Sequence, residues 1–140
     1  MIADSLAGQM RTAAVSLLGR LDEEQRALAA RPFADEAARR WLEYRPRHRP
    51  GACLAELTPA ARKAAHRLLA TGLSEHAYAQ AMGIVALEEV LDSRERWQRA
   101  RHSGDYWASV YGDPEDGQPW SWWLDFGGDV LAAHYERDRR

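Results

Sequence analysis

The chain has 140 residues, of which 46% are hydrophobic and 29% charged, and its formal net charge is −2. These values are typical of one globular domain with a modest core. The slightly negative net charge argues against a dedicated nucleic-acid binder, because such proteins are normally strongly basic. Cys53 is the only cysteine, so the sequence excludes an intrachain disulfide and a cysteine metal cluster.

The N-terminus carries Asp4 and lacks a basic segment that leads into a long apolar run. A secretory signal needs that arrangement, and a membrane span needs about 18 consecutive apolar residues, which the sequence lacks throughout. We therefore expect a cytoplasmic protein with no membrane contact.

Three helices are predicted in the first third of the chain, at about residues 3–18, 22–30 and 35–43. Asp22 and Gln25 match the capping-box pattern at the start of the second helix. The first helix has its apolar residues at the i, i+3, i+4 spacing of a helix that packs on a core. Its apolar face consists of Leu6, Met10, Ala13, Ala14, Leu17, Leu18 and Leu21.

The most basic stretch of the chain follows at residues 44–51, with the sequence YRPRHRPG. Two prolines and a glycine exclude a regular helix and predict an extended loop. We interpret its arginines as solvated side chains, one of which pairs with an internal acid. A contact with an anion or with nucleic acid is the alternative.

Two further helices are predicted at about residues 59–71 and 75–102. Thr58 precedes Pro59 in the order that favours a helix start, and Ser74 is the expected N-cap of the second helix. The first of these helices has one face of small and aliphatic side chains and an opposite face that we expect to be solvated. The apolar face is Ala61, Ala64, Ala65, Leu68 and Leu69, and the solvated face is Arg62, Lys63, His66 and Arg67.

The stretch 72–91 is apolar on every side of a helical wheel. A helix with this pattern is normally buried all round, so we predict that it is the central helix of the domain. Gly83 lies in the middle of it and costs about 1 kcal/mol relative to alanine. We therefore expect another backbone to approach the helix closely at Gly83.

Residues 105–126 are predicted to form an aromatic β-hairpin, because DYWASVY and WSWWLDF flank the turn-rich segment GDPEDGQP. The tail at 129–140 has the pattern of a terminal helix. The predicted fold is therefore one mainly α domain (α+β). It is a compact helical domain around a buried central helix, with a small C-terminal aromatic β-hairpin.

Glu88 and Glu89 are the main chemical candidates, because the predicted central helix places them among apolar positions. A buried acid needs a partner or has a shifted pKa. The favoured interpretation is structural, with an acid that pairs with Arg39 or Arg49 and holds a loop on the core. The alternative is an enzyme that uses these carboxylates and arginines on a small acidic molecule.

The hairpin contains four tryptophans, and alternation along a strand places Trp120 and Trp122 on one face and Trp123 on the other. One face can cover the helices, whereas exposed aromatic surface on the other face is typical of interaction sites. We therefore rank first an interaction or structural module whose hairpin binds a protein partner or a second copy. The candidate binding residues are Trp41, His102, Tyr106, Trp107, Trp120, Trp122 and Trp123.

The five histidines are scattered, and none forms a zincin-like pair with a nearby acid. No metal site, no cofactor and no nucleic-acid partner is therefore predicted from the residues themselves.

A series of motifs runs through the chain: Trp41, Pro46, Arg49 and Gly51, then LLATGLSEHAYAQAMGIVALEEVL, RHSGDYW, YGDP and PWSWW. This series resembles the N-terminal part of the domain-of-unknown-function 3500 family, from about Leu21 to Trp122, and the resemblance implies no biochemical activity. Members of that family continue into a Gly-His-His sequence, where this chain reads Phe126-Gly127-Gly128-Asp129, so we expect a short or truncated member. Metal binding, as a property of longer members, is the third function considered.

Overall fold

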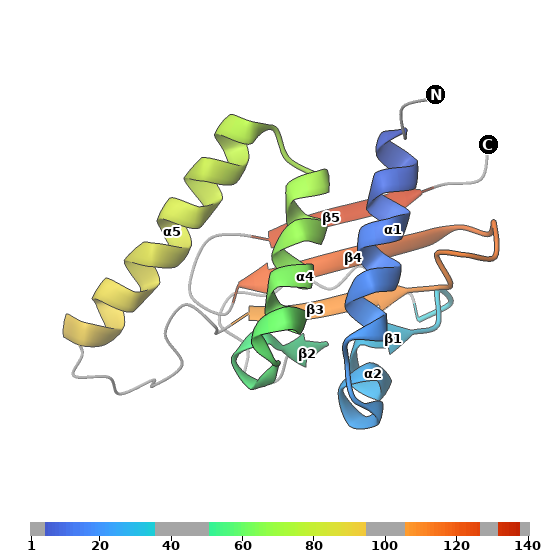
Figure 1. Cartoon of the computed structure of the whole chain (residues 1–140), viewed down its shortest axis with the longest axis horizontal. Helices are drawn as coiled ribbons and strands as arrows, with labels where there is room; N and C mark the ends of the chain where they lie inside the picture. Colours follow the sequence, from blue (N-terminus) through green and yellow to red (C-terminus); the bar gives the residue numbers. More distant parts are fainter. Residues whose placement is uncertain (1–4, 36–50, 95–105, 127–131, 138–140) are drawn as a thin grey trace.

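The computed structural model describes residues 5–35, 51–94, 106–126 and 132–137. Helices and a small sheet are both present, so the prediction of an α+β fold is confirmed (Figure 1). The elements, in chain order, are α1 (Leu6–Gly19), α2 (Glu23–Ala29), β1 (Ala30–Arg31), β2 (Ala52–Cys53), the 3-10 turn η1 (Leu54–Glu56), α4 (Pro59–Thr71), α5 (Glu75–Arg94), β3 (Tyr106–Tyr111), β4 (Trp120–Phe126) and β5 (Ala132–Arg137).

The sheet has the strand order β1-β3-β4-β5, and β2 also pairs with β3. β3 and β4 form the predicted antiparallel hairpin, with Ala108 opposite Leu124. The tail does not form a helix, because residues 132–137 pair with β4 as the antiparallel strand β5. The edge of β4 offers backbone hydrogen bonds along the whole segment, and a short isolated helix is only marginally stable in water.

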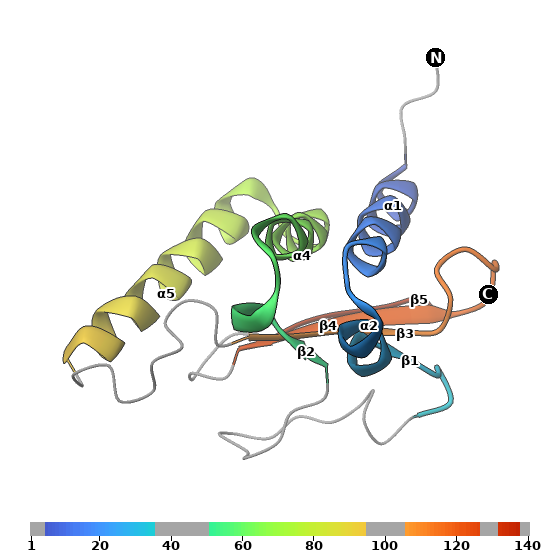
Figure 2. The ribbon, with the colours of Figure 1, turned by 60° about the horizontal axis from the view of Figure 1, so that its bottom comes forward.

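Helices α1 and α4 lie side by side on one face of the sheet (Figure 2). The apolar face predicted for α4 is buried in full, and most of the face predicted for α1 is buried as well. The sheet contributes Tyr106, Ala108, Val110, Trp120, Trp122 and Leu124 to the same core. The two helices and the sheet therefore form the two layers between which the domain buries its apolar side chains.

Trp122 occupies the middle of this core and is only 1% exposed. A Cβ atom built on Gly72 would lie 2.9 Å from Cζ2 of the Trp122 ring, so the ring passes directly under the end of α4. Gly72 has a right-handed backbone conformation with φ of −95°. Its missing side chain therefore makes room for the tryptophan rather than permitting an unusual turn.

α5 is not the buried central helix that its sequence pattern predicts. Its N-terminal half packs on the core through Ala81 and Val85, but Leu87 is 60% exposed and Val90 is 49% exposed. No heavy atom outside α5 lies within 4 Å of a Cβ built on Gly83, so no backbone approaches there. The helix runs outward beside α4 (Figure 1), and α1 and α4 cover the sheet in its place.

The predicted helix starts are confirmed by hydrogen bonds. The Asp22 side chain accepts from the Gln25 amide while the Gln25 side chain accepts from the Asp22 amide, which is a complete capping box. Thr58 Oγ1 accepts from the Ala61 amide, and Ser74 Oγ accepts from the Ala77 amide. These caps define where α2, α4 and α5 begin.

Candidate functional site

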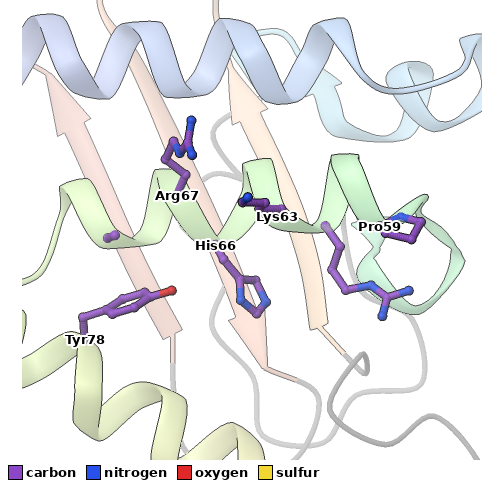
Figure 3. A pocket seen from close by; sticks show the side chains of 7 residues that line it. Pro59, Lys63, His66, Arg67 and Tyr78 are labelled. Carbon is purple, nitrogen blue, oxygen red and sulfur yellow. The ribbon is translucent and has the colours of Figure 1, made fainter.

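A groove of about 500 Å³ lies between α4 and α5 (Figure 3). Tyr78 reaches into it from α5 with its hydroxyl toward the side of α4 that carries His66. Lys63 and Arg67 extend toward the α1 side of α4 and form one rim of the groove. The complete lining is Pro59, Arg62, Lys63, His66, Arg67, Ala70 and Tyr78.

The periodicity of α4 fixes this arrangement. The helix buries its alanine and leucine face on the sheet, which leaves the opposite stripe to face outward. The outward residues recur at spacings of three and four, so Arg62 and His66 are adjacent in one row and Lys63 and Arg67 in the next. One helical face therefore holds three cationic side chains and a histidine within two turns.

The positive charge on this face has no compensating acid in the helices that cover the sheet. The sequences of α1 (LAGQMRTAAVSLLG) and α4 (PAARKAAHRLLAT) contain no aspartate or glutamate. In the described part of the chain, neither Lys63 nor Arg67 forms an ion pair. Like charges at i and i+4 destabilise a helix by about 0.2–0.5 kcal/mol, so the Lys63–Arg67 pair costs stability that no acid within α1 or α4 offsets.

The same two cations also border a second hollow on the other side of α4. This smaller hollow, of about 280 Å³, lies between α1 and α4 and includes Arg20 and Ser16. Lys63 and Arg67 therefore stand on a ridge between two concave surfaces. An anion on either side of the ridge would lie near both cations.

His66 is half-buried in the wall of the groove. Burial, and secondarily the positive charge of Arg62, lowers the pKa of His66 below its ordinary value of 6.5. The imidazole is therefore neutral at pH 7 and can either donate or accept a hydrogen bond. An anion bound beside it would oppose both effects and favour its protonated form.

The acids and arginines proposed from the sequence are not among the described residues that line this groove, and their pairing stays a prediction. Glu88 and Glu89 lie in the C-terminal half of α5, between the exposed residues Leu87 and Val90. The sequence argument for them depended on a helix buried on all sides, which α5 is not. Their proposed partners Arg39 and Arg49 lie outside the described residues.

The aromatic candidates are divided between the two faces of the sheet. Tyr106, Trp120 and Trp122 are buried under the helices, as the predicted alternation requires. Trp107 and Trp123 are half-buried and belong to the opposite face. Trp123 is opposite Ser109 and Trp107 is opposite Asp125, so the two rings occupy diagonal positions on neighbouring strands.

Two other binding candidates, Trp41 and His102, lie outside the described residues. The groove residues on α4 were visible in the sequence only as a solvated face. The signal that marks them is the absence of any acid among them or in α1, which distinguishes this face from an ordinary surface of mixed charge.

Within the ranges that the structure describes, no group of three or more histidine, cysteine, aspartate or glutamate side chains could hold a metal ion. None of the helices there combines the length and the apolar character that crossing a membrane requires.

Comparison with known proteins gives one finding. The family model described as "Protein of unknown function (DUF3500)" matches residues 3–134, which is nearly the whole chain. The match extends over both helices of the layer on the sheet, α5 and the hairpin. No curated protein and no solved structure matches the chain.

Proposed function

The chain belongs to the DUF3500 family of proteins of unknown function, and we propose that this domain is a binding module for an anionic ligand. The ligand would bind in the groove between α4 and α5, against the cationic rim formed by Lys63 and Arg67. The proposed function is still that of an interaction module, but its binding site lies on the helical layer rather than on the hairpin.

The observation that carries the proposal is the positive charge of α4, which no acid within α1 or α4 compensates. The whole chain has a net charge of −2, yet the helices over the sheet carry cations and no acids. Charged hydrogen bonds to an anion contribute about 1.5–3 kcal/mol each, which exceeds the cost of placing Lys63 and Arg67 together. A surface that is unfavourable without its ligand is typical of a functional site.

The experiment is a titration of the purified protein with inorganic phosphate at low ionic strength, followed by amide chemical shifts. We expect the α4 signals to shift. Replacement of both rim residues, in the variant Lys63→Gln/Arg67→Gln, should weaken binding by roughly a hundredfold if each contact contributes about 1.4 kcal/mol.

The matched control is Arg11→Gln, which also removes a positive charge from an exposed helical position. Arg11 borders a different hollow together with Glu115. It should leave phosphate binding within about twofold of the original in a titration repeated at about 0.1 M salt, because charges that do not contact the anion are largely screened there and Arg11 lines a different hollow from the groove. Equal weakening in both variants, or an absence of binding to the unmodified protein, would refute the proposed function.

A second candidate function is association through the outer face of the sheet. The specific observation is that Trp107 and Trp123 lie diagonally on the face opposite α1 and α4 and remain half-buried. Aromatic side chains in such a position are favoured at protein interfaces. The mass of the native protein in dilute solution tests this candidate. We expect a dimer that dissociates in the Trp107→Ser variant. A monomer in the unmodified protein would exclude self-association.

A further inference from the structure

We infer that the ligand of the α4–α5 groove is a small organic acid, with its anionic group at the rim of Lys63 and Arg67 and an apolar or aromatic body against Tyr78. This inference rests on the proposed function and adds the chemical class of the ligand. Phosphate esters and carboxylates share the chemistry that the rim recognises, and the experiment below distinguishes them.

The groove has the size of a site for a small organic ligand. Its volume of about 500 Å³ lies within the range of roughly 300–1,000 Å³ that is common for sites of small organic ligands. A water molecule occupies about 30 Å³ of liquid, and an inorganic oxyanion needs only a few times that volume. From Pro59 to Ala70 the lined face of α4 extends over about 16 Å at 1.5 Å per residue. Most of the groove would therefore remain empty around a simple ion.

Most of the charge and the aromatic surface lie in different parts of the groove. Lys63 and Arg67 extend on the α1 side of α4, whereas His66 and Tyr78 lie on the α5 side (Figure 3). Arg62 adds a cation in the row of His66 near Pro59, so the uncharged part of the lining is Ala70 together with Tyr78. A ligand that satisfies both parts needs an anionic group at one edge and an uncharged body that can lie against the phenol ring.

The second wall of the groove, formed by α5, disfavours a long polyanion. The sequence of α5 contains four acids, of which Glu75 is exposed, and a single arginine, so a phosphate chain that follows this helix would meet more negative than positive charge. Surfaces that follow a nucleic-acid backbone need cations along the whole path. A compact ligand avoids this wall, because its charge remains beside α4. The acids of α5 are Glu75, Glu88, Glu89 and Asp92, and its arginine is Arg94.

The experiment compares phenyl phosphate with inorganic phosphate, and benzoate with acetate, in titrations of the full chain under the same conditions. We expect at least one aromatic anion to bind at least tenfold more tightly than its small counterpart. A preference for phenyl phosphate assigns the ligand to the phosphate esters, and a preference for benzoate assigns it to the carboxylates.

The variant Tyr78→Leu removes the ring that the inference places against the ligand body. It should reduce the preference to threefold or less and leave the affinity for the small anion unchanged. Tyr78 also packs against the core, so a second variant, Ala70→Leu, fills the end of the groove without a change of charge. It should reduce the same preference, and circular dichroism checks that both variants are folded.

Two results separate this inference from the proposed function. If none of the four anions binds, the proposed function fails and this inference fails with it. If phosphate and acetate bind as tightly as phenyl phosphate and benzoate, the groove binds anions without selecting an organic body. That second result overturns the inference alone.

Discussion

Replacement of Gly72 by alanine tests the central packing of the domain. The new Cβ atom would lie 2.9 Å from Cζ2 and 3.2 Å from Cη2 of the Trp122 ring, closer than side-chain carbon atoms normally approach. The ring is 1% exposed and belongs to the core, so it cannot turn away into solvent. The Gly72 backbone is right-handed, and the substitution therefore adds no strain of its own there.

The magnitude follows from two opposing effects. Overpacking of a core costs about 1–3 kcal/mol, whereas alanine is favoured over glycine in a helical conformation by up to about 1 kcal/mol. We expect Gly72→Ala to lower the free energy of unfolding by about 1–2 kcal/mol. The matched control is Gly83→Ala, because no heavy atom outside α5 lies within 4 Å of the new Cβ there. It should raise the free energy of unfolding by about 0.5–1 kcal/mol.

The assay is urea unfolding followed by tryptophan fluorescence. A urea dependence of about 2 kcal/mol per molar, usual for a small domain, would separate the midpoints of the two variants by roughly 1 M. Crystal structures of both variants would show whether the Trp122 ring has moved. If Gly72→Ala is as stable as the unmodified protein, with the ring in place, the close approach of Trp122 to α4 is refuted.

Three further predictions concern the same two layers and the groove. Leu69→Ala removes a fully buried side chain of α4 and should lower the free energy of unfolding by about 2–5 kcal/mol. Leu87→Ala on the exposed side of α5 should change it by no more than about 0.5 kcal/mol. Equal losses in the two variants would show that Leu87 is buried in the core. Asp22→Ala removes the capping box of α2 and should cost about 1 kcal/mol in thermal unfolding, and an unchanged melting temperature would contradict the hydrogen bonds at that cap. The pKa of His66 is lowered in the folded state, so just below pH 6.5 the unfolded chain binds more protons than the folded chain. The free energy of unfolding should therefore fall as the pH is lowered through this window, and it should level off above pH 6.5. His66→Asn should remove that part of the pH dependence measured by urea unfolding, and an unchanged slope would show that His66 does not cause it.

The sequence alone determined the local structure of most of the described chain. The apolar spacing of α1 and α4 identified the faces that are buried, because a helix that packs on a core must repeat its apolar residues every three or four positions. Asp22, Thr58 and Ser74 marked helix starts through side-chain oxygens that accept backbone hydrogen bonds. Strand alternation correctly placed Trp120 and Trp122 on the helix side of the hairpin.

Only the tertiary structure decided which helices cover the sheet and where the groove lies. The apolar pattern of α5 predicted burial on all sides, but Leu87 and Val90 are exposed, because α1 and α4 cover the sheet and α5 runs outward beside α4 (Figure 1). The tail became β5 because β4 offered it a free edge, a partner that local sequence does not contain. The groove exists because Tyr78 on α5 faces the cationic side of α4, and such proximity depends on packing between elements rather than on spacing within one.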